Sequence, residues 1–282
     1  MQLYKIIALL ILCSSCTAVK VSVPETFSKM ATKMPVKGLN GWMINQKLTF
    51  GDYQTSSVKR GWDFSGSLQY TKFRIRPEEA LLKVLNIDVD NKNLKQRNKF
   101  QYTIENGNDI AEVYATERFS EKQLVYKSNN PYIGSASKTK KYEYAFTAGI
   151  IPLTLNNNAP WSLVLINTYD INNDTNRKIF GQPNVEEEGY ATNGEKSIAL
   201  RSLRVENVST KDGKEVKAFG GKLLSGYELS INNETVAVID ILENSIWLHN
   251  TLSSDDKLVV SSIASAILLK RIQDVEKDKD DS

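Results

Sequence analysis

The chain has 282 residues, of which 41% are hydrophobic and 24% charged, and it carries a formal net charge of +3. These values are typical of a globular protein and exclude a collagenous, fully disordered or integral-membrane chain. Lysine and arginine alternate with acidic residues along the chain instead of forming one basic stripe, so we expect no nucleic-acid partner.

The N-terminal segment 1–15 has the order of an export signal. Lys5 precedes an unbroken apolar run over residues 6–12, and two serines supply small side chains just before Cys16. This run of seven apolar residues is far shorter than the ~20 that a membrane-spanning helix needs. Residues 1–15 are therefore predicted to be a removable signal peptide rather than a permanent transmembrane helix.

The end of this segment, Leu12-Cys13-Ser14-Ser15-Cys16, resembles the lipobox of bacterial lipoproteins in its Bacteroidetes-like form. It departs from the family pattern at Cys13, where the family prefers leucine. The resemblance implies that Cys16 becomes the mature N-terminus and carries acyl chains such as palmitate, which anchor a protein in a membrane. The expected location is the cell envelope, at the outer membrane or cell surface. A plain secreted protein and a cytosolic protein are the alternatives.

The chain after the signal divides into three parts. Residues 17–37 mix Lys, Ser, Thr and Val with two prolines and show no sustained periodicity, so 16–37 is predicted to be a lipidated tether. A single β-rich domain is expected over 38–273, and a charged tail over 274–282. Both cysteines precede the domain, and a domain of this size can fold without a disulfide.

Short stretches of β-branched and aromatic residues, punctuated by Gly, Asn and Asp, dominate the domain and are typical of a mostly β fold. Aromatic residues alternate with charged and small ones over 141–148, which predicts a strand with one buried face. Residues 161–169 are nearly continuously apolar, which predicts a strand covered on both faces. Further strands are expected over 42–50, 53–62, 100–104 and 123–126, and a short helix over 77–85.

Two asparagine-containing turns separate three strand candidates near the C-terminus. Asparagine tolerates the positive φ that two-residue hairpin turns require, so two hairpins in series are predicted. The strands are expected over 227–231, 235–242 and 245–249, with turns at Asn232-Asn233 and Glu243-Asn244.

A helix is predicted from Ser253 to about Gln273, because Ser253 and Asp256 have the spacing of a capping box. Its interior, residues 258–269, is interrupted only by serines, and apolar side chains lie on every side of the helix. Such a helix must be buried all round. The expected fold class is therefore mostly β, an antiparallel barrel or sandwich with a buried apolar C-terminal helix.

The strands 236–240 and 246–248, followed directly by the apolar helix 258–269, resemble the C-terminal part of the tubby-like barrel. That fold is shared by tubby, plant LURP-one-related proteins and phospholipid scramblases. The resemblance rests on pattern and order and implies an antiparallel barrel that encloses the helix. A generic sandwich or α+β domain is the alternative.

One segment has part of the pattern of a calcium loop. Asp170, Asn172 and Asp174 offer oxygen ligands at the spacing of the first loop positions. The pattern fails at Thr175, where the sharp-turn glycine belongs, and at Gly181, where a closing glutamate would stand. A polar turn is the preferred interpretation, and we expect no metal and no cofactor.

The other candidate residues also have plain interpretations. His249 is the single histidine, so any histidine-based triad or metal site would need it, and we expect it to be a surface or packing residue. The acidic triplet Glu186–Glu188 is interpreted as a solvated face. Core packing is the default for four aromatic residues that could instead form a sugar- or lipid-facing platform: Trp42, Tyr53, Trp62 and Tyr70.

The residue inventory favours a protein without catalytic activity. No thiol besides Cys16 remains in the mature chain, and no nucleophile motif or metal-ligand motif occurs. We expect an envelope lipoprotein that binds a lipid, glycan or protein partner or serves in the assembly of a surface complex. The alternatives are a glycan hydrolase that uses two carboxylates and a lipid-handling barrel of the tubby-like kind.

Overall fold

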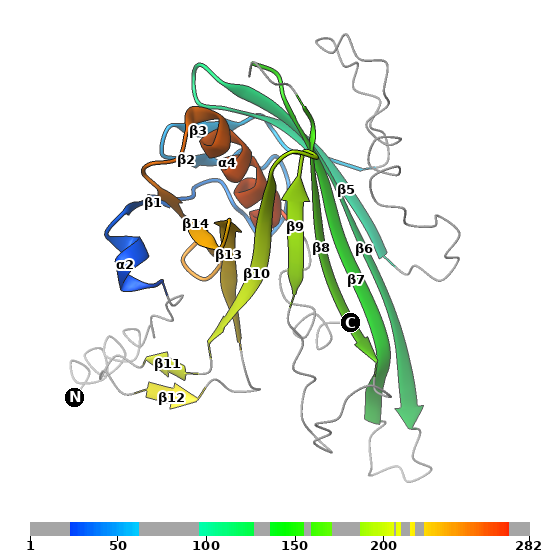
Figure 1. The fold of residues 1–282 in the computed structure, drawn as a ribbon. Helices are drawn as coiled ribbons and strands as arrows, with labels where there is room; N and C mark the ends of the chain where they lie inside the picture. The colour runs from blue at the N-terminus through cyan, green and yellow to red at the C-terminus, as the bar shows by residue number, and fades with distance from the viewer. Residues whose placement is uncertain are drawn as a thin grey trace, which may run out of the picture.

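A curled antiparallel sheet forms the body of the molecule (Figure 1). The computed structural model describes residues 23–61, 96–126, 136–154, 159–170, 187–205, 207–209, 215–217 and 223–270. The strands of the main sheet are β1 (Ala31–Pro35), β2 (Thr49–Phe50), β3 (Tyr53–Thr55), β4 (Lys59–Arg60), β5 (Gln96–Glu105), β6 (Ile110–Tyr126), β7 (Ala136–Pro152), β8 (Trp161–Asp170), β9 (Glu188–Thr192), β10 (Ser197–Val205), β13 (Leu223–Ile231), β14 (Glu234–Asp240) and β15 (Ser245–His249). A separate hairpin pairs β11 (Asn207–Ser209) with β12 (Glu215–Lys217).

The two ends of the main sheet meet. The strands follow the order β1-β15-β14-β13-β10-β9-β8-β7-β6-β5-β3-β2, and β4 pairs with β5 beside this path. Just after β1, the Lys37 N–H donates to the Thr49 carbonyl at 3.0 Å, and the Thr49 N–H donates to the Lys37 carbonyl at 3.1 Å. Thr49 belongs to β2, so this pairing joins the first and last strands of the order. The sheet is a nearly closed barrel, which confirms the mostly β class and selects the barrel over the sandwich.

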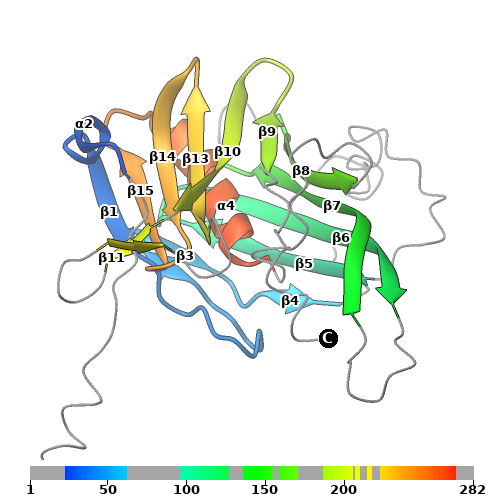
Figure 2. The same ribbon diagram turned by 90° about the horizontal axis from the view of Figure 1, so that it is seen from below.

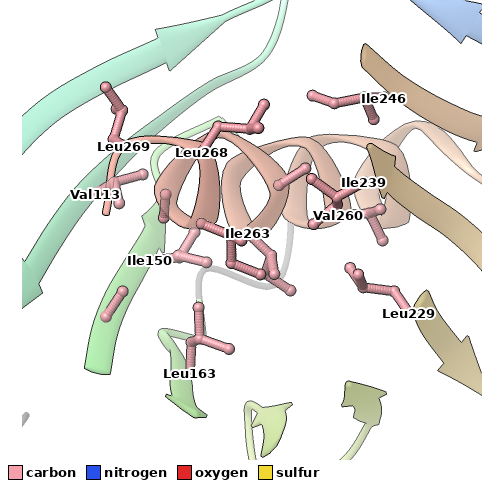
Figure 3. Close-up of a cluster of buried hydrophobic side chains, with 14 of the residues drawn as sticks. Val113, Ile150, Leu163, Leu229, Ile239, Ile246, Val260, Ile263, Leu268 and Leu269 are labelled. Atoms are coloured by element: carbon pink, nitrogen blue, oxygen red, sulfur yellow. The ribbon is translucent and has the colours of Figure 1, made fainter. Parts of the chain in front are cut away.

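The helix α4 (Ser254–Leu268) lies inside the curve of the sheet (Figure 2). All residues from Leu258 to Leu269 are buried, as an all-round apolar helix requires. The prediction of a central C-terminal helix is therefore confirmed, although the helix ends at Leu268 instead of near Gln273. Figure 3 shows helix side chains facing strands on several sides of the barrel: Val260, Ile263, Leu268 and Leu269 from the helix, and Val113, Ile150, Leu163, Leu229, Ile239 and Ile246 from the strands.

Two buried serines of α4 donate hydrogen bonds to carbonyls of the helix itself. The Ser262 hydroxyl donates to the Leu258 carbonyl one turn earlier at 2.8 Å, and the Ser265 hydroxyl donates to the Ser262 carbonyl at 3.0 Å. Ser265 also shares a hydrogen bond of 2.7 Å with the Tyr102 phenol on β5. This contact between helix and wall fixes the rotation of α4 in its apolar surroundings.

The start of α4 has the predicted cap. The Asp256 N–H donates to the Ser253 Oγ at 3.1 Å, while the Ser253 hydroxyl donates to the Asp256 carboxylate at 2.7 Å. We expect Ser253→Ala to lower the free energy of unfolding by about 1 kcal/mol, because an N-terminal amide of the helix loses its acceptor. Urea titration followed by circular dichroism measures this loss. Ser254→Ala is the matched control, and an equal loss in both variants would contradict the assigned cap.

The barrel begins earlier in the chain than predicted. The helix α2 (Glu25–Ser28) and β1 both lie within the expected tether 16–37. β1 pairs with β15, and Phe27 of α2 packs against Val238 on the outer face of β14. The sequence pattern hides β1 because this strand buries only the side chain of Met34. Residues 25–28 and 31–35 therefore belong to the folded domain and not to the tether expected over 16–37.

The C-terminal hairpins agree with the prediction in their order and turns, but β13 begins at Leu223 instead of Tyr227 and β14 at Glu234 instead of Thr235. Asn232 and Asn233 have φ values of 50° and 66°, and Asn244 has a φ of 50°. β14 ends at Asp240 instead of residue 242, because the Asp240 carboxylate accepts the Leu242 and Glu243 N–H groups at 2.9 and 3.0 Å and starts the turn.

Further upstream the outcome is mixed. Within the described residues, the strand expected over 42–50 is reduced to β2, and the strand expected over 53–62 is divided into the short strands β3 and β4. The helix expected over 77–85 and the tail over 274–282 lie outside the described residues.

Candidate functional site

The inward-facing side chains of the barrel change from apolar to polar at one level. Side chains on one face of a strand recur every second residue. In β5, β6 and β8 the apolar Phe100, Ala115 and Leu165 each lie two residues from a polar side chain on the same face of the strand, namely Asn98, Glu117 and Asn167. The Asn98 amide donates to the Glu117 carboxylate at 3.2 Å, and the Tyr144 hydroxyl of β7 donates to its other oxygen at 2.9 Å. A polar layer thus crosses the interior beside the apolar core.

The chain reaches this layer again directly after α4. The Lys270 ammonium donates to the Glu187 carboxylate at 3.2 Å and to the Tyr227 phenol oxygen at 2.7 Å. Tyr227 donates its own proton to the same Glu187 oxygen. The ammonium also lies 5.2 Å from the centre of the Tyr144 ring. We call these five residues the buried charge cluster: Glu117, Tyr144, Glu187, Tyr227 and Lys270.

The electrostatics of the cluster follow from its burial. The side chains of Lys270 and Glu187 are both 0% exposed. Burial raises the pKa of the Tyr144 phenol well above its ordinary value, and the neighbouring Glu117 and Glu187 carboxylates raise it further. Tyr144 therefore keeps its proton and remains a hydrogen-bond donor to Glu117. The second oxygen of Glu187 is also buried and has no hydrogen-bond partner among the described residues.

The C-terminal end of α4 is also bound by an arginine from the wall. The Arg60 guanidinium of β4 donates to the Leu269 carbonyl and to the Gln46 side-chain oxygen, both at 2.8 Å. Helix C-termini present unpaired carbonyls and a partial negative charge, so Arg60 and Lys270 are favourable neighbours there. Together with the cluster, this contact holds the end of the helix against β4, β7 and β13.

The cluster resembles a structural anchor more closely than a catalytic centre. Its carboxylates, phenols and ammonium are general acid–base groups, yet all five side chains are buried and mutually hydrogen-bonded or in close contact. A substrate would have to displace those bonds to reach them. Sequence reasoning missed the cluster because Glu187 looked like part of a solvated acidic run. That interpretation is wrong for Glu187, whose burial depends on partners 40 and 83 residues away.

The other sequence candidates do not form a site within the described residues. His249 packs its ring 6.0 Å from that of Phe27, and its Nδ1 lies 2.9 Å from the Thr251 hydroxyl. Among the described residues no three His, Cys, Asp or Glu side chains are grouped to hold a metal ion. Asn172 and Asp174 lie outside the described residues, as does the side chain of Asp170.

The proposed aromatic platform is not formed by the residues that can be placed. Tyr53 is buried and stacks on Phe50 in the core, whereas Trp42 is 87% exposed in the loop that joins β1 to β2. Trp62 and Tyr70 lie outside the described residues. The default interpretation, core packing, is confirmed for Tyr53 and wrong for Trp42.

The loop over residues 38–47 is the second candidate site. Trp42 and Ile44 are exposed by 87% and 65%. The Asn40 side chain donates to the Ile44 carbonyl at 3.1 Å, and the Met43 N–H donates to the Asn40 carbonyl at 3.2 Å. Met43 has a φ of 54°, a left-handed conformation that is uncommon for a bulky residue. The loop therefore presents two apolar side chains to solvent from a fixed shape.

No known family model, curated protein sequence or solved structure matches this chain. Within the part of the chain that the structure describes, no helix is long and apolar enough to cross a membrane. The class that the fold defines is thus an antiparallel β-barrel filled by its own C-terminal helix.

Proposed function

We propose that the protein is a lipoprotein of the cell envelope, exported by residues 1–15 and acylated on Cys16. Its barrel acts beside the membrane by binding a lipid, glycan or protein partner or by supporting the assembly of a surface complex. The observation that carries this proposal is the lipobox-like segment together with its small separation from the folded domain. Six residues separate Cys16 from Val23, and the seven residue-to-residue steps reach at most about 25 Å when fully extended.

The filled interior supports binding at the surface rather than inside the barrel. Small-molecule sites in barrels normally occupy the interior or its mouth. Here α4 fills the interior with side chains that are 0–5% exposed from Leu258 to Leu269. The polar layer beyond its end is occupied by the buried charge cluster. A partner would therefore contact outer strands or loops.

Metabolic labelling with radioactive palmitate tests the anchor. We expect the wild-type chain to incorporate label and Cys16→Ser to lose it completely and to become soluble after cell lysis. Cys13→Ser is the matched control, because it removes a neighbouring thiol and preserves the acylated one. Label retained by Cys16→Ser, or mature protein that still begins at Met1, would contradict the proposal.

A carboxylate-dependent glycan hydrolase is the alternative that one observation favours. Glu117 and Glu187 both lie close enough to Tyr144 to raise the pKa of its phenol, and paired carboxylates are the usual machinery of glycoside hydrolysis. The burial of both side chains argues against this role. Release of reducing sugars from an envelope polysaccharide by the wild type, with loss of that activity in Glu117→Gln, would establish the alternative.

A lipid-handling barrel of the tubby-like kind is the other alternative. An antiparallel barrel around an apolar C-terminal helix has the arrangement that the resemblance implied. Architecture alone does not establish function. Selective flotation of the protein with vesicles of one lipid headgroup would support this role.

A further inference from the structure

The loop between β1 and β2 exposes apolar side chains that the fold does not use. Trp42 and Ile44 are among the few large hydrophobic side chains exposed in the described residues, and they stand two positions apart in one loop. By contrast, Leu39 at the start of the loop packs against the core, and Gln46 at its end is 3% exposed. The loop is thus held to the barrel at both ends while its tip projects outward.

The shape of this tip is built by short-range contacts. The Asn40 side chain and backbone bind Ile44 and Met43, and the Gln46 amide donates to the Asn40 carbonyl at 3.3 Å. At the base, Gly38 approaches the Lys47 carbonyl so closely that an added Cβ would lie 1.9 Å from its oxygen. These contacts fix the loop in a shape that exposes Trp42 and Ile44. Binding of these two side chains to a partner surface would therefore cost little conformational entropy.

The base of the tip is positively charged. Lys37 and Lys47 are exposed on the two sides of the loop, and neither forms an ion pair with any described residue. Lys59 is also exposed, one residue after Val58, whose N–H donates to the Gln46 carbonyl at 2.8 Å. An aromatic and an aliphatic side chain in a loop flanked by exposed lysines match the layers of a bilayer surface, where tryptophan lies at the headgroup level and cations meet lipid phosphates.

The tether allows the tip and the lipid to meet the same surface. β1 and its continuation to Lys37 cover seven residues from Ala31, about 20–23 Å of strand. The chain from Cys16 to Val23 has six residues between its ends and reaches about 25 Å at most. The chain before α2 is therefore long enough for a lipid on Cys16 to enter the same bilayer as the loop that follows β1.

We propose that the tip formed by Trp42 and Ile44, with Lys37 and Lys47 at its base, inserts into the headgroup region of the bilayer that holds the Cys16 lipid. This second contact rests on the proposed lipid anchor and sets the orientation of the barrel on the membrane. Two apolar side chains are too few for the core of a stable protein interface, which buries about 800 Å² on each partner. They are sufficient as a supplement to an acyl anchor.

Spin labelling of the lipidated full-length protein in anionic vesicles tests the proposal. In the acylated mature chain Cys16 carries no free thiol, so Ile44→Cys introduces a single labelling site. We expect a nitroxide at residue 44 to be protected from a water-soluble nickel quencher and accessible to oxygen. The control is Glu195→Cys, because residue 195 is exposed in the turn between β9 and β10 and that turn contacts the start of α4 rather than its end. The control label should remain fully accessible to nickel.

Charge variants separate the lipid contact from other causes of protection. Replacing Lys37 and Lys47 by glutamine should lower the equilibrium constant for insertion of the labelled loop into anionic vesicles by about fivefold for each lysine. Equal nickel accessibility at residues 44 and 195, with the lipid on Cys16 verified by mass spectrometry, would overturn the loop proposal and leave the anchor intact. Protection that persists without vesicles would assign the tip to a protein contact and also overturn the proposal. Labelling of the wild-type chain would show a free Cys16 thiol and refute the anchor itself.

Discussion

Replacing Lys270 by methionine is expected to lower the free energy of unfolding by about 3–5 kcal/mol. The substitution removes the cation that lies 3.2 Å from Glu187 and leaves that carboxylate buried without its charge partner. The Tyr227 phenol also loses the ammonium that donates to it at 2.7 Å. A buried charge that has lost its partner costs far more than a surface pair contributes, because the protein interior does not replace the lost hydration.

Urea denaturation of the full-length chain, followed by far-ultraviolet circular dichroism, measures this loss. Lys196→Met is the matched control, since Lys196 lies 2.9 Å from Asp256 but its side chain is 58% exposed. Exposed pairs contribute at most about 1 kcal/mol, so this variant should stay close to the wild type. The double variant Lys270→Met with Glu187→Met should recover much of the lost stability. Equal effects of Lys270→Met and Lys196→Met would contradict the buried pairing.

Local signals made the C-terminal part of the fold predictable. Asn232 and Asn233 have the positive φ that a tight turn needs, and Ser253 accepts the Asp256 N–H as the capping spacing requires. The buried helix followed from composition alone, because residues 258–269 have no polar face to present to water. Each of these features depends on residues close together in the chain.

The pairing of β1 with β15 and the buried charge cluster depend on residues far apart in the chain. The pairing of Lys37 with Thr49 joins the two ends of the sheet order. The sequence around these two residues does not predict that their strands pair. Glu187 stands among acidic neighbours, which predicts solvent, and only the contact with Lys270 explains its burial. Such pairings leave no mark on either segment. The exposed Trp42 shows the reverse case, in which an aromatic residue that predicts a core lies on the surface.

Ile263→Ala in α4 is expected to lower the free energy of unfolding by about 2–5 kcal/mol. Ile263 is 0% exposed and faces strand side chains around the helix (Figure 3), so its truncation leaves a cavity that the surrounding strands cannot collapse to fill. Ile44→Ala provides the same chemical change at a side chain that is 65% exposed, and it should alter stability by no more than about 0.5 kcal/mol. Thermal and urea unfolding of the two variants in parallel measure the difference.

The two isoleucines separate stability from membrane contact. If the loop proposal is correct, Ile44→Ala should weaken insertion of the Trp42 tip into anionic vesicles while the barrel remains as stable as the wild type. Ile263→Ala should give the opposite result, a destabilised barrel whose folded fraction still inserts the tip. A large stability loss in Ile44→Ala would show that this side chain packs against the protein, because a solvated isoleucine loses almost no packing on truncation.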